Sequence, residues 1–219
     1  GGGQTTLNVS GQLDNAGRLT SGAGMTINAG GVRNYGTTAA GTDLTLTTGN
    51  LVNASGLFFS GKDMSLRVAD LNNSYGNIYS LGNLTIDRDG RGGLANSIVN
   101  RSASLQSDGS MTLAASSIQN IRDVLTVNNA GIYTARIGEV TCIEGVNAGD
   151  CSGKQNHAWE IVQREKLEVT SASAASSITA GGNLTLNGGD LLNQSSTIAT
   201  AGNFIANVAN LTNSGVETG

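Results

Sequence analysis

The sequence predicts an all-β fold: a right-handed parallel β-helix with three short strands and about 20 residues in each coil, interrupted by one extra-helical β-hairpin. Three observations predict it. Segments with apolar residues at every second position recur at a nearly constant spacing, an Asn recurs at the same place in each repeat, and the 219 residues include 32 Gly but no Pro. Alternation with a period of two is typical of a half-buried strand, and a 20-residue repeat of such strands indicates stacked coils that bury a common core.

Two of the three strands in each coil are predicted from two kinds of triplet that recur with the repeat. The first triplet is apolar, small polar, apolar, and it occurs at residues 25–27, 44–46, 64–66, 84–86, 111–113, 184–186 and, less regularly, 204–206. The second triplet ends in Ser, Ala or Thr, and it occurs at 19–21, 58–60, 78–80, 105–107, 178–180 and 198–200, with a weak copy at 38–40.

The third strand ends in an apolar-x-Asn pattern whose Asn we expect at a corner of the coil. Asn tolerates the left-handed backbone that a sharp corner needs, and its amide can both donate and accept hydrogen bonds. The sequence therefore predicts an asparagine ladder along the stack. Its members are Asn15, Asn34, Asn53, Asn73, Asn100, Asn120, Asn193 and Asn213.

Composition agrees with this fold and narrows the function. Aromatic residues make up 4% of the chain against 38% hydrophobic residues in total, which predicts a thin core of Leu, Ile, Val, Met and Ala. Pro would remove ladder hydrogen bonds, so its absence is expected. A net charge of −4 offers no basic stripe for nucleic acid, and no apolar run has the length of a membrane span. The opening Gly1-Gly2-Gly3 suggests a piece of a longer protein in which the helix continues.

Two breaks in the spacing divide the chain. We expect β-helix coils at 1–120 with a surface loop at about 87–93, a hairpin insertion at 121–177, and further coils of the same shaft at 178–219. Inside the insertion, two alternating segments flank Cys142 and Cys151. The spacing predicts a two-stranded ribbon in which Val127 lies opposite Lys166, closed at its tip by a Cys142–Cys151 disulfide. The alternative, a metal site of Cys142, Cys151 and His157, offers only three ligands.

The insertion also holds the residues that could contact a partner. One interpretation is that Trp159 and Tyr133 pack the ribbon against the shaft. The other is that an exposed aromatic and charged face binds a partner. The candidate binding residues are Tyr133, Arg136, His157, Trp159 and Arg164.

Catalytic chemistry has weak support in the sequence. A single His supports no nucleophile-base pair. Asp43 and Asp63 occupy equivalent positions one coil apart, a carboxylate separation of about 5 Å that suits polysaccharide cleavage. The same position is Asn83 or Ser110 in other repeats, which indicates a turn residue instead. The sequence therefore predicts no enzyme, no metal and no cofactor.

Three stretches carry a resemblance to a known family. "AGGNLTLNGGDLLNQSSTIATAGNFIANVANLTNSG", "SGAGMTINAGGVRNYG" and "SYGNIYSLGNLTIDRDG" resemble the filamentous haemagglutinin repeats of bacterial two-partner secretion exoproteins. These include haemagglutinin adhesins and contact-dependent growth inhibition proteins. "HAWEIVQREKLEVTSASAASSITAGGNLTLN" is similar to a junction in growth-inhibition exoproteins where an insertion precedes the last coils. The cysteine pair departs from the family, because such exoproteins usually avoid cysteine.

The resemblance implies a stiff rod that an outer-membrane transporter exports to the bacterial cell surface, where it holds an adhesive or toxin-bearing region away from the cell. It carries over no catalytic residue. The alternatives are a module that binds a receptor or glycan through residues 121–177 and, less favoured, a polysaccharide-cleaving β-helix enzyme.

Overall fold

The computed structural model describes residues 2–142 and 156–216, and the regular elements of these residues are all strands. None of the described residues lies in a helix that is long and apolar enough to cross a membrane. The chain forms two compact units. One contains the residues up to Val124 together with Ser173–Val216, and the other contains Leu125–Ala172.

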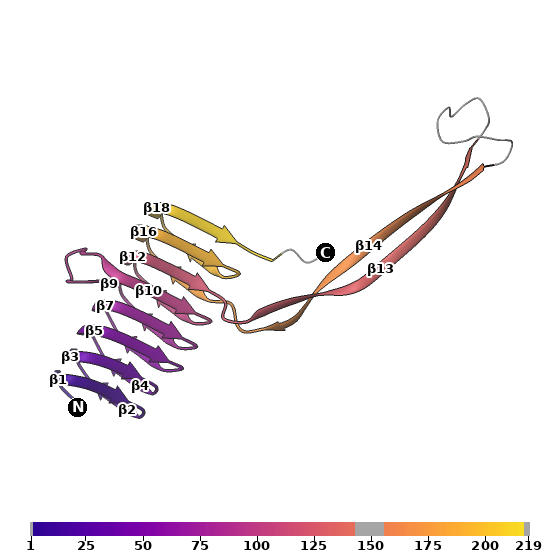
Figure 1. The fold of residues 1–219 in the computed structure, drawn as a ribbon. Coiled ribbons are helices and arrows are strands. Elements are labelled where there is room, and N and C mark those ends of the chain that lie inside the picture. The colour runs from indigo at the N-terminus through magenta and orange to yellow at the C-terminus, as the bar shows by residue number, and fades with distance from the viewer. Residues whose placement is uncertain (1, 143–155, 217–219) are drawn as a thin grey trace. The chain divides into compact units, whose positions relative to one another are not determined.

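The first unit is a solenoid of two parallel sheets, and Figure 1 shows its strands stacked one coil on the next. The nine-stranded sheet follows the order β1-β3-β5-β7-β10-β12-β16-β18, with β9 paired to β7 and β12. Its strands are β1 (Thr5–Asn15), β3 (Met25–Asn34), β5 (Leu44–Ala54), β7 (Met64–Ser74), β9 (Leu84–Asp87), β10 (Ala95–Arg101), β12 (Met111–Ile121), β16 (Leu184–Gln194) and β18 (Phe204–Ser214).

The seven-stranded sheet is made of four-residue strands in the order β17-β15-β11-β8-β6-β4-β2. These are β2 (Arg18–Ser21), β4 (Thr37–Ala40), β6 (Leu57–Ser60), β8 (Asn77–Ser80), β11 (Ser104–Ser107), β15 (Ser177–Ala180) and β17 (Thr197–Thr200). Each strand pairs in parallel with its equivalent one coil away, so Leu44 lies between Met25 and Met64. The predicted parallel solenoid is confirmed.

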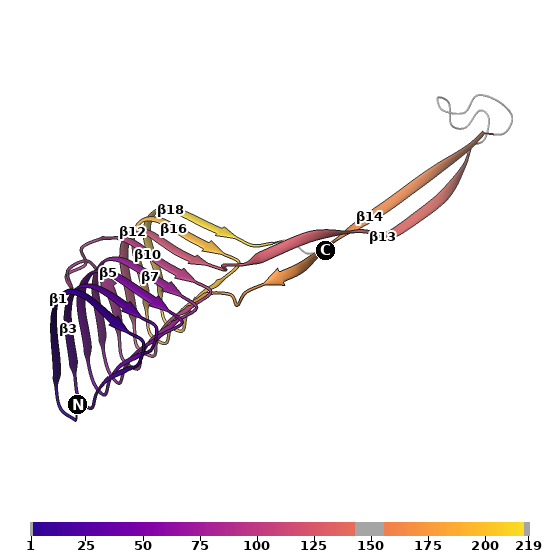
Figure 2. The ribbon, with the colours of Figure 1, turned by 60° about the horizontal axis from the view of Figure 1, so that its bottom comes forward.

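The strand count per coil differs from the prediction. The first and third predicted strands of most coils are one long strand that bends in its middle, as β16 and β18 do in Figure 2. In β5 the register with β7 is unbroken from Leu44 to Thr48 and again from Asn50 to Ala54. Only the coil of β9 and β10 has two separate strands in this sheet, because residues 88–94 leave the ladder as a loop.

The core lies between the two sheets and consists of the alternating apolar residues. Leu44, Leu46 and Leu51 of β5 and Phe58 of β6 are fully buried. Phe59, the next residue along β6, points to the outside and is partly exposed. Because each coil contributes only a few such side chains, the core is a narrow column whose stability depends on stacking.

The second unit is an antiparallel ribbon of β13 (Leu125–Cys142) and β14 (Asn156–Ala172). The predicted register is wrong: Val127 pairs with Val169, and Leu167 with Asn129. The pairing shifts at irregularities between Asn129 and Ile132 and between Ile132 and Thr134, and Cys142 pairs with Asn156. The prediction counted the register symmetrically from the two cysteines. It therefore included neither the irregularities nor the pairing of Cys142 with Asn156. Cys151 lies outside the described residues, so the disulfide stays a prediction.

Candidate functional site

Eight asparagines at the ends of the long strands form one column through the solenoid. The amide Nδ2 of each of the first seven donates a hydrogen bond to Oδ1 of the Asn in the next coil, at 2.8–2.9 Å. The column runs through Asn15, Asn34, Asn53, Asn73, Asn100, Asn120, Asn193 and Asn213. Its five central members, from Asn34 to Asn120, are fully buried.

The same amides close the sharp turns that follow most of the long strands. Asn100 Nδ2 also lies 3.0 Å from the carbonyl oxygen of Ala103 and 2.9 Å from that of Ser177. Ser102, in the turn, has φ = 45°, in the left-handed region. Asn is suited to this position because one amide supplies the donor for the turn and both the donor and the acceptor for the column, whereas a carboxylate has no donor.

A second polar column lies at the end of the short strands, and sequence reasoning missed it. Ser60 Oγ donates to the carbonyl oxygen of Lys62 at 2.9 Å and lies 3.0 Å from Ser80 Oγ. Ser107 Oγ donates to the carbonyl oxygen of Gly109 at 3.0 Å. The signal was present as the recurrent Ser at the end of the second triplet.

Asp43 and Asp63 cap backbone groups of neighbouring coils. The backbone N–H of Asp63 donates to Asp43 Oδ1 at 3.1 Å, and that of Asn83 donates to Asp63 Oδ1 at 2.7 Å. Asn83 Oδ1 in turn accepts from the N–H of Ser110 at 2.9 Å. The Asn83 amide oxygen and the carboxylates of Asp43 and Asp63 each accept from the backbone N–H one coil away. The geometry is therefore that of a turn cap and does not require an acid-base pair.

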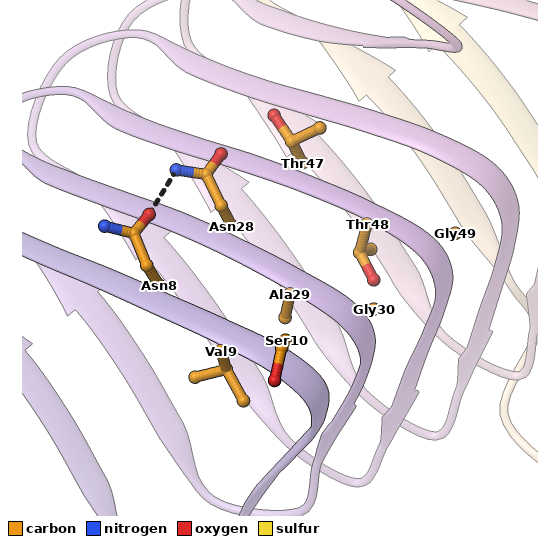
Figure 3. A pocket seen from close by; sticks show the side chains of 9 residues that line it. All are labelled: Asn8, Val9, Ser10, Asn28, Ala29, Gly30, Thr47, Thr48 and Gly49. Atoms are coloured by element: carbon orange, nitrogen blue, oxygen red, sulfur yellow. Dashed lines mark hydrogen bonds between the residues drawn. The ribbon is translucent and has the colours of Figure 1, made fainter.

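A shallow hollow lies over the bends of β1, β3 and β5, and Figure 3 shows its lining. Asn28 Nδ2 donates to Asn8 Oδ1 at 2.9 Å, between neighbouring coils at one side of the hollow. Gly30 and Gly49 form part of its floor, where they leave the backbone bare. None of its lining residues carries a charge, so the hollow offers no acid or base for chemistry.

The loop between β9 and β10 is held by two carboxylates. Asp87, almost fully buried, accepts from the N–H groups of Gly90 at 2.6 Å and Gly92 at 2.8 Å. Asp89 accepts from the N–H groups of Arg91 and Gly93, which lowers the pKa of this carboxyl below its ordinary value. Both aspartates are therefore used within the loop.

The insertion leaves and re-enters the solenoid through a polar cluster, which we call the root. The Tyr75 hydroxyl donates to the Asp123 carboxylate, and Arg101 Nη1 lies 3.2 Å from the same group. Ser102 Oγ lies 2.7 Å from Ser173 Oγ, which accepts from the N–H of Val124 at 2.9 Å. These bonds join residues that are far apart in the sequence, and no pattern in the sequence indicated them.

Ser176 completes the root from inside the solenoid. Its hydroxyl is buried and donates toward the carbonyl oxygens of Asn100, at 3.0 Å, and Ile121, at 2.7 Å. It also accepts from the N–H of Ala103 at 3.1 Å. The turn of the interrupted coil is thereby tied to the coil before it.

The candidate partner-binding residues all belong to the ribbon. Arg136 pairs with Val162 and Arg164 with Thr134, and both arginine side chains are exposed. His157 pairs with Thr141, and Trp159 with Glu139. The side chains of Tyr133, His157 and Trp159 lie outside the described part of the chain. Within that part, no group of three or more His, Cys, Asp or Glu side chains could hold a metal ion, and the alternative set of Cys142, Cys151 and His157 falls outside it.

Comparison with known proteins finds a family model that matches most of this chain. The model of the haemagglutinin repeat family matches residues 1–57, 48–92, 82–136 and 145–218. The chain belongs to the haemagglutinin-repeat family. No solved structure is a significant match to it.

A curated relative of this haemagglutinin-repeat chain is a protein of Dickeya dadantii (strain 3937) described as "Deoxyribonuclease CdiA". The two are 29% identical over 138 residues, which is 62% of this chain but 4% of the relative. The chain thus spans a small fraction of the relative's length.

The root gives a pH-dependent prediction for this haemagglutinin-repeat chain. Hydrogen bonds from Tyr75 and then Arg101 hold the pKa of Asp123 below its ordinary value, while the bond to Asp123 raises the pKa of Tyr75. A carboxylate with a lowered folded-state pKa stabilises the fold above its ordinary value of about 4, and this contribution is lost as the pH falls through the folded-state value. We expect Asp123→Asn to lower the melting temperature at pH 7 and to lower it by less at pH 3, because the contribution is lost as the pH falls through the folded-state pKa of Asp123. An equal effect at both pH values would contradict this role.

The root also predicts that the insertion can be removed. Deleting residues 122–174 joins Ile121 to Ala175, so that Asn120 is followed by as many turn residues as Asn100 is. Since the equivalent residue Ser102 has a positive φ, Ala175→Gly should accompany the deletion. We expect a cooperatively unfolding β-protein by circular dichroism. A deletion of equal length at 120–172 removes Asn120 from the column and is expected to be much less stable.

Proposed function

We propose that this chain is a rigid rod segment of a secreted exoprotein on the bacterial outer cell surface, where it presents an adhesive or toxin-delivering region of the complete protein to a target cell. The family membership supports the rod and its export. The name of the Dickeya dadantii relative supports the toxin-delivering form, since a deoxyribonuclease activity must reach its substrate in another compartment.

The observation that carries the proposal is that the asparagine column is continuous across the insertion. Asn120 Nδ2 donates to Asn193 Oδ1 at 2.9 Å although 73 residues separate them. The pairing of β12 with β16 and of β11 with β15 also continues past this point. Because a solenoid bends where a nearest-neighbour interface is lost, unbroken ladders favour stiffness.

Export of the rod would use an outer-membrane transporter of the two-partner secretion type. Each coil contacts mainly its neighbours, so coils can fold one at a time onto those already outside. This order of folding suits a chain that emerges gradually from a pore.

Export is tested on intact cells. An epitope placed between Arg91 and Gly92, in the loop after β9, should be detected by antibody on cells that make the parent exoprotein together with its transporter, and not on cells that lack the transporter. Detection in both strains, or in neither, would contradict the proposed route.

Rigidity is tested by comparing two variants in the same cells: one rod that is shorter by one coil and one rod that is made flexible. Deleting residues 44–63 removes one coil in register and should shorten the rod by about 4.8 Å with little loss of target-cell contact. Replacing residues 44–119 by a flexible Gly/Ser linker of equal length should abolish contact while the distal part remains on the surface. Full activity of the linker form would show that reach without stiffness is sufficient.

A second candidate function is partner binding by the ribbon, which is favoured by the exposed Arg136 and Arg164 on one of its faces. Arg136→Ala with Arg164→Ala should reduce adhesion or target-cell inhibition if the ribbon contacts a receptor or glycan. The deletion of residues 122–174 supplies the comparison, because it removes the whole ribbon. Unchanged activity in both variants would leave the rod as the function of the chain.

A further inference from the structure

One column of outward-facing residues crosses the first coils of the nine-stranded sheet. Asn8 pairs with Asn28, Asn28 pairs with Thr47, and each pair lies one coil further along the stack. All three residues line the hollow over the bends, where Figure 3 shows them in one row. The next residue of the column is Arg67, which pairs with Thr47. The column therefore leads from a neutral polar hollow to a positive charge on the adjacent coil.

The hollow has unused capacity for hydrogen bonds. The bond from Asn28 to Asn8 leaves the second amide group of each side chain without a partner among the described residues. The exposed hydroxyls of Ser10 and Thr47 likewise make no hydrogen bond within the part of the chain that the structure describes. The hollow has a volume of about 610 Å³, which lies within the usual range of ligand sites.

Arg67 has no partner for its charge. Its Nε atom is buried without a hydrogen bond, and its guanidinium group forms no ion pair with any described residue. A guanidinium group offers five N–H donors, and charges that are partly removed from water are normally paired. The group therefore keeps its full capacity to bind an anion from outside the chain.

The carboxylates around Arg67 are already bonded to neutral groups. Asp87 pairs with Arg67 in the ladder, but its two oxygens accept from the N–H groups of Gly90 and Gly92. Asp70, three residues further along β7, accepts from an amide and a hydroxyl group at 3.0 Å and 2.7 Å. The sequence thus places acids beside Arg67, and the fold uses them elsewhere.

The loop after β9 holds the guanidinium group in place. A Cβ atom at Gly90 would lie 2.5 Å from Arg67 Nε, so a glycine is needed for the loop to pack this closely onto the side chain. Gly90 also has φ = 77°, in the left-handed region that favours glycine. A cation that is fixed before a ligand arrives loses less entropy on binding.

We propose that the hollow and Arg67 together form a binding site for an acidic polysaccharide that contains uronic acids. Because Gly90 covers Nε, a sugar carboxylate binds end-on to Nη1 and Nη2 through two parallel hydrogen bonds, a geometry that suits a planar carboxylate. The hydroxyls of the neighbouring sugars bond to the amide and hydroxyl groups of the hollow, which can both donate and accept.

The distribution of charge favours this class of ligand over other polyanions. The residues that line the hollow are all uncharged, and the positive charge lies at one end of the column. A nucleic acid carries a charge on every phosphate and requires several cations along its path. A polysaccharide with neutral hydroxyl groups between its carboxylates matches a neutral hollow that ends at a single guanidinium group.

Calorimetric titration of the full 219-residue chain with two matched oligosaccharides tests the site. One is a hexamer of β-1,4-linked glucuronic acid. The other is cellohexaose, which has the same rings and linkages but a CH₂OH group in place of each carboxylate. We expect the glucuronate hexamer to bind at least about tenfold more tightly, and the difference to shrink as added salt screens the charges.

Three variants test the assigned residues. Arg67→Gln should weaken binding of the glucuronate hexamer by at least about tenfold and leave cellohexaose unaffected, because it removes only the charge contact. Thr47→Val should weaken the glucuronate hexamer by about threefold through the loss of one neutral hydrogen bond. Arg33→Gln is the matched control, since Arg33 is exposed on β3 outside the column and its loss should change neither ligand.

Circular dichroism checks that each variant folds, and Arg67→Gln removes no hydrogen bond within the described residues, so its melting temperature should stay close to that of the wild-type chain. The proposal is overturned if the glucuronate hexamer does not bind up to its solubility limit, if cellohexaose binds equally well, or if the control variant weakens binding as much as Arg67→Gln does. Displacement of the hexamer by inorganic sulfate at equal concentration would also overturn it, because the site would then accept any anion.

Discussion

A chain carrying Asn100→Asp is expected to lose about 3 kcal/mol or more of its free energy of unfolding at pH 7, and to regain much of that loss near pH 4. Asn100 is fully buried, and its amide nitrogen faces Asn120 Oδ1 at 2.9 Å and the carbonyl oxygens of Ala103 and Ser177. A carboxylate has no hydrogen to donate to these three acceptors, so the carboxylate oxygen that replaces the amide nitrogen would face only oxygen atoms.

The pH dependence follows from the same geometry. Burial and the surrounding acceptors favour the protonated carboxyl, which raises its folded-state pKa above the unfolded value. For a raised acid pKa, the folded state is most stable below the unfolded pKa, and stability is lost as the pH rises through the folded-state pKa. Urea unfolding of the variant and the wild-type chain at pH 4 and pH 7 measures this difference.

Two controls separate charge from the loss of the hydrogen bonds. Asn100→Ala removes the same bonds without adding a charge, and should cost about 2 to 3 kcal/mol with the pH dependence of the wild-type chain. Asn213→Ala alters the exposed end of the column and should cost about 0.5 kcal/mol or less. If Asn100→Asp were as stable as the wild-type chain at pH 7, the amide donors would have no structural role.

Features that recur in the repeats were predictable, because each copy supports the others. The inward positions of Leu44 and Phe58 and the corner position of Asn53 follow from period-two alternation repeated in coil after coil. The joining of the first and third strands was not predictable. The strand bends at small residues such as Thr48 and Gly49, which resemble a turn in the sequence. In the structure the residues on either side of the bend stay in the ladder.

Features that occur once were the ones that sequence reasoning missed. The ribbon register depends on the pairing of Cys142 with Asn156 and on backbone irregularities near Ile132, where Gly131 has φ = 86°. Neither follows from counting outward from the two cysteines. The root depends on Tyr75, Arg101 and Asp123, which lie at or just after the ends of three different strands that only the stacking of coils brings together. Such contacts follow from the fold and cannot be read from spacing alone.

Phe58→Ala is expected to destabilise the solenoid by about 3 to 5 kcal/mol. Phe58 is the largest fully buried side chain of the core and lies between Thr38 and Ile78 of the neighbouring short strands. Parallel ladders fix the distance between coils, so the neighbours cannot collapse into the space that the ring leaves. Denaturant unfolding followed by circular dichroism should show a lower midpoint.

Phe59→Ala is the matched control, because it removes the same ring from the adjacent residue on the outer side of β6. The Phe59 ring lies edge-to-face with that of Tyr79, with ring centroids 5.8 Å apart, and is only partly buried. Loss of this contact should cost about 1 kcal/mol. A large difference between neighbouring phenylalanines is a direct consequence of strand alternation, and equal costs would mean that Phe58 does not fill the interior between the two sheets.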